Sequence, residues 1–319
     1  MASGGPGRIL GLIILGVEMS TLIIRHFGGL RVREGPRSIE LPTDFPRSLF
    51  SFLSLNAGRV FCRTHLTETH WPDLPIERGK RALSTALWRL RKCNAVAGSI
   101  HRLGRDRLVF APTQRTWVDA LAFQHIVNRA GRGGAQAGHL LIRAIAIYEG
   151  AAFSDLSDDW ALTERARLEN TYCDALAMLA QISFESGDFR AAESLATRLT
   201  KLEPFREDIR EIQMKAAMMQ GNVAQAERFY REFKAILMDD LMEPPRCNIE
   251  DLTKEVRASE YGATVFDRRS LEAGYSDDVA RSIRRVRRSL KQFDRRLETL
   301  SNTIVGRPKC AGAPAKQGH

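Results

Sequence analysis

The segment from residue 76 to residue 92, IERGKRALSTALWRLRK, combines six arginines and lysines with one tryptophan and two hydroxyl side chains. On a helical wheel at 100° per residue, its small and aliphatic residues gather on one face, which carries Gly79, Leu83, Ala86, Leu87 and Leu90. The outward residues include no acid and are cationic, hydrogen-bonding or aromatic: Arg78, Arg81, Ser84, Thr85, Trp88, Arg89 and Lys92. Side chains of these types at this spacing can bond to phosphates and base edges along a DNA groove.

Two other interpretations of this face compete with DNA binding. A solvated helix face usually mixes glutamate with lysine or arginine, because i,i+4 ion pairs stabilise it. Here the single acid is Glu77, in the first turn, where the helix dipole favours a negative charge. A membrane-surface helix needs large apolar residues free to insert, whereas these leucines are needed for a core. We therefore favour a DNA-recognition helix, with a plain solvated face and a membrane helix as alternatives.

The outward residues would divide into two roles in a DNA groove. We expect Arg81 and Thr85 to approach base edges, and Arg78, Arg89 and Lys92 mostly to contact phosphates. Trp88 either stacks against a sugar or shields the helix, and the sequence leaves both open.

The elements around this helix are those of a winged helix-turn-helix spanning residues 19–113. Short β-prone runs between Leu22 and Leu41 predict a small antiparallel sheet. Helix signals follow between Asp44 and Asn56 and again at residues 64–69. Residues 99–110 predict a terminal hairpin that turns at Gly104-Arg105-Asp106.

From residue 116 to residue 260 the pattern changes to long helices with apolar periodicity. Gly187-Asp188-Phe189 and Gly221-Asn222-Val223 are related by an offset of 34 residues, which also pairs Ala192 with Ala226. A 34-residue period of helix, glycine-containing turn and helix is typical of tetratricopeptide repeats (TPR). A helix pair near 118–150 and a long helix over 159–186 are expected to extend the array.

Charge is distributed unevenly along the chain. Residues 1–115 hold 18 basic and 8 acidic side chains, residues 116–260 hold 17 and 24, and residues 261–319 hold 13 and 6. The basic head and tail around an acidic body indicate a nucleic-acid or acidic-membrane module fused to a region with another task.

The residue types required for metal binding or catalysis do not cluster. The five cysteines are widely spaced without a CxxC pair, so we expect reduced thiols in a cytoplasmic protein. Cys62, His65 and His70 lack a second ligand pair at matching distance, so no zinc site is predicted. The segment GRGGAQAG at 131–138 lacks the lysine of a phosphate-binding loop. We predict no enzyme, no cofactor and no metal.

The N-terminal segment has an apolar run from Ile9 to Val17 that ends at Glu18. The run is too short to span a bilayer, and no signal-peptide cleavage site follows it. Met19 is a plausible native start, so we expect residues 1–18 to be an upstream extension and predict no membrane attachment.

The C-terminal segment 275–305 is a basic heptad helix by its pattern. Its apolar positions alternate at spacings of four and three: Val279, Ile283, Val286, Leu290, Phe293, Leu297, Leu300 and Ile304. One interpretation is a coiled coil that forms a homodimer. The alternatives are a helix folded back on the acidic array, or contact with DNA or membrane. Residues 306–319 are expected to be disordered.

Several ordered motifs in residues 22–257 resemble the SARP family of bacterial transcription activators. They include LNAGRVFCRTHLTETHWPDLPIERGKRALSTALWRLRK at 55–92, AIYEGAAFSDLSDDWALTERARLENTYCDALAMLA at 146–180 and MDDLMEPP at 238–245. The resemblance implies an OmpR-type winged helix followed by a TPR-like bacterial transcriptional activator domain. The expected fold class is therefore mainly α with a small α+β head, an α-helical array and a C-terminal heptad helix.

The resemblance also implies a function. Family members bind promoter direct repeats in double-stranded DNA and engage RNA polymerase. Residues 76–92 would be the recognition helix, and the wing would present Arg102, Arg105 and Arg107. The loop with Trp71, Pro72 and Asp73 is where OmpR-type activators often touch polymerase, although Trp71 itself is expected in the core. The alternative function is a TPR scaffold that binds a protein partner or ligand on the array and nucleic acid only non-specifically.

The outward residues depart from the family pattern. Positions 81, 84, 85 and 88 carry Arg, Ser, Thr and Trp, where related proteins often carry Asn, Arg, Gln and Ser. The target DNA sequence therefore cannot be transferred from the family.

Overall fold

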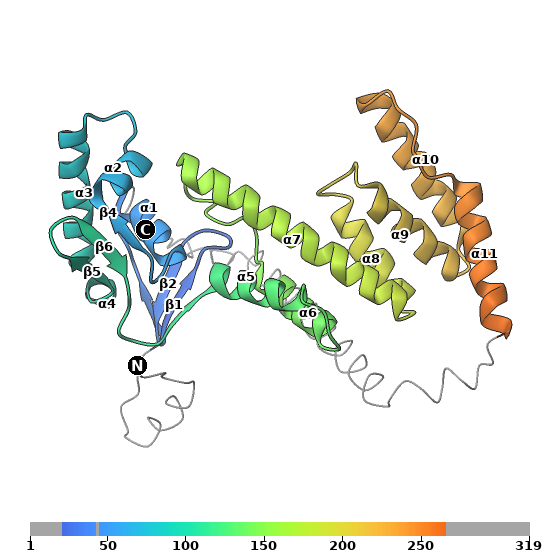
Figure 1. Ribbon diagram of the computed structural model, residues 1–319, viewed down its shortest axis with the longest axis horizontal. Helices are drawn as coiled ribbons and strands as arrows, with labels where there is room; N and C mark the ends of the chain where they lie inside the picture. The colour runs from blue at the N-terminus through green and yellow to red at the C-terminus, as the bar shows by residue number, and fades with distance from the viewer. Residues whose placement is uncertain (1–20, 43–44, 266–319) are drawn as a thin grey trace, which may run out of the picture. The chain divides into compact units, whose positions relative to one another are not determined.

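The computed structural model describes residues 21–42 and 45–265 (Figure 1). The expected N-terminal extension, the heptad helix with its eight apolar positions and the C-terminal tail all lie outside the described residues. The chain divides into two compact units, residues 1–252 and 253–319, and the features below belong to the first. Only α11 (Ile249–Val265) continues into the second. The described protein is mainly α-helical with a small β-containing head, as expected.

The first sheet of the head has the strand order β3-β2-β1-β7. It consists of β1 (Leu22–Arg25), β2 (Arg31–Glu34), β3 (Arg37–Ile39) and β7 (Thr116–Val118). β1 is antiparallel to β2 and parallel to β7, so Ile24 faces both Val32 and Val118. The antiparallel part is confirmed. The pairing of β7 was not predicted, because a three-residue strand carries almost no periodic signal.

The second sheet has the order β4-β6-β5, from β4 (Val60–Cys62), β5 (Ile100–Leu103) and β6 (Arg107–Phe110). β5 and β6 form the predicted hairpin, which is the wing. Gly104 in its turn has a φ of +70°, a conformation that glycine adopts without steric cost. β4 pairs with β6 and was not predicted.

Four helices complete the head: α1 (Phe45–Leu55), α2 (Arg63–His70), α3 (Ile76–Arg91) and α4 (Asn94–Ala97). The five residues predicted to face inward on α3 are all buried. Four of them, all except Gly79, join Leu49, Phe50 and Leu66 in one hydrophobic core with β1, β2 and the wing. α2 and α3 approach closely at Gly79, where an added Cβ would lie 2.3 Å from Thr67 Cγ2.

The array contains α5 (Asp119–Ala130), α6 (Ala137–Ile147), α7 (Asp159–Glu185), α8 (Phe189–Leu199), α9 (Glu207–Met219) and α10 (Val223–Asp240). Each helix packs against the next one in the chain (Figure 1). The 34-residue offset is repeated in the backbone, because Gly187 and Gly221 have φ angles of +77° and +78°. The residues after them, Asp188 and Asn222, both accept a helix-capping hydrogen bond. These features give a TPR-like array.

Head and array meet where β1 passes the start of α5. The buried carboxylate of Asp119 accepts hydrogen bonds from the backbone N–H groups of His26 (2.8 Å), Phe27 (3.0 Å) and Ala120 (2.6 Å). Burial raises the pKa of Asp119, although these hydrogen bonds lower it. The carboxylate therefore connects the residues directly after β1, the first strand of the head, to the first helix of the array.

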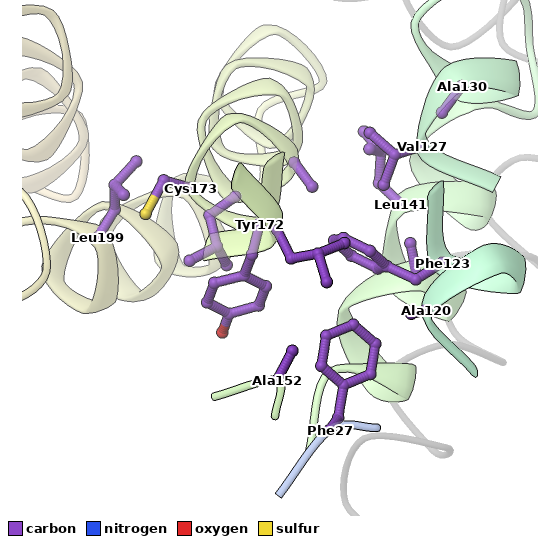
Figure 2. Packing of buried hydrophobic residues seen from close by; sticks show 14 of the residues in the cluster. Phe27, Ala120, Phe123, Val127, Ala130, Leu141, Ala152, Tyr172, Cys173 and Leu199 are labelled. Carbon is purple, nitrogen blue, oxygen red and sulfur yellow. The ribbon is translucent and has the colours of Figure 1, made fainter. Parts of the chain in front are cut away.

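The side chain of Phe27 belongs to the core of the array. Its ring centroid lies 5.5 Å from that of Phe123 and 4.7 Å from that of Tyr148. Figure 2 shows Phe27 beside Ala152 and Phe123. Head and array thus share buried surface.

Two buried histidines lie at this junction. The ring of His26 bonds to Ser54 Oγ at 3.1 Å, and burial lowers the His26 pKa to about 3. His70 Nδ1 lies 3.1 Å from Ser48 Oγ, which also accepts a hydrogen bond from Trp160 Nε1 of α7. Burial and the neighbouring His65 lower the His70 pKa to about 4. Both rings are therefore neutral at pH 7.

Candidate nucleic-acid interface

The outer face of α3 is exposed as the sequence predicts. Arg78, Arg81, Ser84, Thr85, Trp88 and Arg89 of α3 and Lys92 at its C-terminal cap are all exposed. Among the described residues, none of these arginines lies within ion-pair distance of a carboxylate; the one pair on the helix joins Lys80 to Glu77 at 3.0 Å. The face therefore retains its positive charge.

The two hydroxyl groups on this face are already oriented by the helix. Thr85 Oγ1 donates to the carbonyl oxygen of Arg81 at 3.1 Å, and Ser84 Oγ donates to that of Lys80 at 2.8 Å. Because each hydroxyl has one proton, both oxygens remain acceptors. Thr85 is thus suited to accept from an adenine or cytosine amino group, or to contact a thymine methyl group.

The wing presents its three predicted arginines to solvent. Arg102, Arg105 and Arg107 are exposed on β5, the turn and β6. Arg102 also donates to the carbonyl oxygen of Arg105 at 3.2 Å across the turn.

Arg63, at the start of α2, joins the wing to α3, and the sequence reasoning missed it. Its Nη2 donates to Ser84 Oγ at 2.7 Å, and its backbone N–H donates to the carbonyl oxygen of Asp106 at 2.8 Å. Its pKa is lowered by burial first and then by Arg102, with a smaller contribution from Arg91, while Asp106 opposes the shift. The junction therefore concentrates like charges, an arrangement that favours a polyanionic partner.

Trp88 and Lys92 form a pair at the C-terminal end of α3. The side chain of Trp88 is 57% exposed, and Lys92 Nζ lies 3.8 Å from the ring centroid. This separation is within the range of a cation–π interaction. Spacing of i,i+4 on a helix could have predicted the contact.

Comparison with known proteins agrees with the fold and the predicted family. Residues 118–257 match the bacterial transcriptional activator domain. The regulatory protein AfsR of Streptomyces griseus is 26% identical over 245 residues, which are 73% of this chain and 24% of AfsR. AfsR of Streptomyces coelicolor is 26% identical over 247 residues, or 75% and 24% of the two chains. Residues 118–257 thus match a bacterial transcriptional activator domain, and most of the chain is similar to part of these two regulatory proteins.

A solved structure supports the fold of this chain. It is that of Mycobacterium tuberculosis EmbR in complex with a low-affinity phosphopeptide, with a TM-score of 0.61 and 20% identity. The match covers 75% of this chain and 65% of EmbR. The matched domain is named for transcriptional activation and the AfsR relatives for regulation, which agrees with the expectation of a regulator rather than an enzyme. The chain spans about a quarter of the length of the AfsR relatives.

Cys62 and His70, two of the three residues that resemble zinc ligands in the sequence, have other partners in the head. Cys62 Sγ accepts a hydrogen bond from the backbone N–H of His65 at 3.4 Å, and His70 bonds to Ser48. Within 21–42 and 45–265 no three His, Cys, Asp or Glu side chains are grouped as metal ligands. In the same ranges, no helix is both long and apolar enough to cross a bilayer.

The loop between α2 and α3 is apolar at its surface. Trp71 is only 5% exposed, which confirms its predicted place in the core. Leu74 and Ile76 are 40% and 57% exposed. A pocket of about 690 Å³ lies between this loop, the start of α1 and α3.

The array also carries a groove of about 650 Å³. The α5–α6 connection, α7 and α9 line it with mainly apolar side chains, including Leu141, Ile182 and Ile212. Two acids at the groove have cationic partners, because Asp208 pairs with Arg206 and Glu211 with Lys215.

Proposed function

We propose that this chain is a SARP-type, sequence-specific DNA-binding activator of transcription, with α3 in the major groove and the wing against the backbone. The observation that carries the proposal is the exposed face of α3, whose arginines have no carboxylate within ion-pair distance among the described residues and which Arg63 connects to the wing. Arg81 and Thr85 would read base edges. Arg78, Arg89, Lys92, Arg63 and the wing arginines would mostly contact phosphates. Such a protein would act in the cytoplasm, where bacterial promoters are.

Binding by the full chain to duplexes selected from random sequence tests this proposal. Arg81→Ala should reduce discrimination between the selected site and a random duplex by about tenfold or more, because a good base contact accounts for about 1–3 kcal/mol. Arg89→Ala should instead weaken binding to both duplexes and flatten the salt dependence by about one unit. Arg190→Ala, an exposed arginine on α8, is the matched control. Unchanged binding by an Arg81→Ala/Lys92→Ala double variant would remove α3 from this role.

Engagement of RNA polymerase is proposed for the exposed loop between α2 and α3. Leu74 offers apolar surface there without contributing to the DNA-facing stripe. Leu74→Ser should therefore keep DNA affinity within about twofold but reduce transcription by purified polymerase in vitro. Full activation by this variant would exclude Leu74 from the contact. Binding to promoter direct repeats as side-by-side protomers, and dimerisation through residues 275–305, remain proposals to be tested by footprinting and sedimentation.

A second candidate function is a scaffold in which the array binds a protein partner and the head attaches to nucleic acid non-specifically. The apolar groove of the array favours this candidate. The two functions are distinguished by selection from random DNA: a scaffold would enrich no site, and its affinity would depend on salt alone.

A further inference from the structure

The exposed indole of Trp88 is unusual on a surface whose other members are cations and hydroxyl groups. It is 57% exposed, so burial in the core does not explain a tryptophan at this position. Its described partner is the ammonium group of Lys92, 3.8 Å from the ring centroid. The Trp88 ring thus contacts the ammonium group of Lys92 in the protein without DNA.

Local backbone geometry fixes the two residues relative to each other. Lys92 is the C-terminal cap of α3, with helical φ and ψ of −72° and −17°. Its backbone N–H donates to the carbonyl oxygens of Trp88 (3.3 Å) and Arg89 (3.2 Å). The aliphatic part of Lys92 therefore starts directly above Trp88, one helical turn away.

The two lysines of this segment differ in what surrounds their ammonium groups. Lys80 is paired with the carboxylate of Glu77 at 3.0 Å, which cancels its charge locally. Among the described residues no carboxylate lies within ion-pair distance of Lys92. An aromatic ring attracts a cation through its quadrupole but carries no net charge, so the ring holds the ammonium group of Lys92 without acting as a counter-ion.

A free lysine side chain samples many rotamers, and ordering it on a phosphate costs conformational entropy. A ring that restricts the side chain beforehand reduces this cost. We propose that Trp88 is a positioning residue that holds Lys92 ready to bind a DNA phosphodiester at the C-terminal end of α3. This inference rests on the proposed DNA-binding function and assigns to Trp88 a role other than sugar stacking or shielding.

A double-mutant cycle on the full chain tests the inference, with the selected duplex and a random duplex of equal length as probes. Lys92→Met should weaken binding to both duplexes and flatten the salt dependence by about one unit. Trp88→Ala should weaken both by about three- to fivefold, the range expected for an exposed cation–π contact. Because one acts through the other, the double variant should bind within twofold of Lys92→Met alone. Trp88→Phe, which keeps an aromatic face, should restore binding to within twofold of the unmodified chain.

Lys80→Met is the matched control, because that lysine is already paired with Glu77, and it should change the salt dependence less than Lys92→Met does. The inference fails if the two losses multiply in the double variant, since Trp88 would then contact DNA by itself. It also fails if Trp88→Ala leaves affinity unchanged. The Arg81→Ala variant separates failure of the Trp88 inference from failure of the DNA-binding proposal. If Arg81→Ala loses discrimination between duplexes while Lys92→Met keeps the full salt dependence, only the Trp88 inference is wrong. If no site is enriched and no α3 variant alters binding, the DNA-binding proposal itself is wrong.

Discussion

Arginines in the head and in the array are surrounded differently. On α3, Arg78, Arg81 and Arg89 project into solvent, and no carboxylate lies within ion-pair distance of them among the described residues. In the array, Arg206 bonds to both Asp208 (2.7 Å) and Glu203 (3.1 Å). These bonds, those to Asp208 first, raise the Arg206 pKa above its ordinary value. The paired arginine orders a connection between helices, whereas the unpaired ones leave a surface that attracts a polyanion.

The head contains both arginines that are paired with carboxylates and arginines that are not. Whether an arginine is paired therefore depends on where it lies in the fold, not on the composition of its region. Arg31 pairs with Glu149, and Arg47 pairs with Asp155, so the head arginines that face the array are neutralised by its acids. Among the described residues, Arg78, Arg81 and Arg89 of α3 have no carboxylate within ion-pair distance. The acids of the array therefore do not neutralise the exposed face of α3.

The largest expected effect concerns the surface that the two regions share. Phe27→Ala should lower the free energy of unfolding by about 3–5 kcal/mol, because the ring is fully buried in the core of the array. Urea denaturation followed by circular dichroism measures this loss. Phe205→Ala, at a ring that is 45% exposed, is the control and should cost much less. A loss below 1 kcal/mol for Phe27→Ala would show that head and array are stabilised separately.

Acid should destabilise the junction between head and array, because two buried neutral histidines lie there. Folded pKa values of about 3 for His26 and about 4 for His70 lie below the ordinary 6.5. The unfolded chain thus takes up protons first as pH falls, so stability is full above about pH 6.5 and declines towards pH 4. Each histidine should contribute a loss of about 2 kcal/mol between pH 6.5 and 5.

Denaturant titration at several pH values checks this decline. His70→Asn keeps an acceptor for the bond to Ser48 and removes one titrating group, so its profile should be flatter. His125→Gln, at an exposed position on α5, should leave the profile unchanged. Equal stability at pH 7 and pH 4.5 would contradict the assignment of both rings as buried and neutral.

A smaller effect is expected where α2 crosses α3. Gly79→Ala should destabilise the head by about 1–2 kcal/mol, because the new methyl group would meet Thr67 Cγ2 at 2.3 Å. The better helix propensity of alanine, up to about 1 kcal/mol, offsets part of this cost. Gly98→Ala meets no atom within 4 Å and serves as the control. Thermal melting of both variants decides the point, and a stabilised Gly79→Ala would mean that the helices can separate freely.

The smallest expected effect on stability comes from comparing an ion-paired arginine of the array with an unpaired arginine of α3. Arg206→Met should lower stability by no more than about 1 kcal/mol, since its ion pairs are partly exposed, and should not alter DNA affinity. Arg81→Met should leave stability within about 0.5 kcal/mol but reduce discrimination between DNA sequences. Parallel melting and DNA titration of the two variants test the contrast. If Arg81→Met destabilised the protein as much as Arg206→Met does, the contrast between a structural Arg206 and a DNA-binding Arg81 would be wrong.

Much of the interface could be predicted because it lies on one helix. The 3.6-residue period places Leu83, Leu87 and Leu90 inside and the cations outside, and the structure confirms this division. Arg63 could not be predicted in the same way. It approaches Ser84 and the wing only after β4 has paired with β6, a contact between residues distant in the chain.

Local periodicity thus determined the helices, the wing, the 34-residue repeat and the polar face of α3, because each depends on residues a few positions apart. Tertiary structure decided how head and array share a core. Strand β7 pairs with β1, Asp119 accepts hydrogen bonds from the backbone around Phe27, and burial is the main reason that the two histidines are neutral. Tertiary structure also decided which arginines meet carboxylates. An ion pair between arginine and carboxylate depends on the distance between the two groups in space, and the positions of the charges in the sequence do not determine that distance.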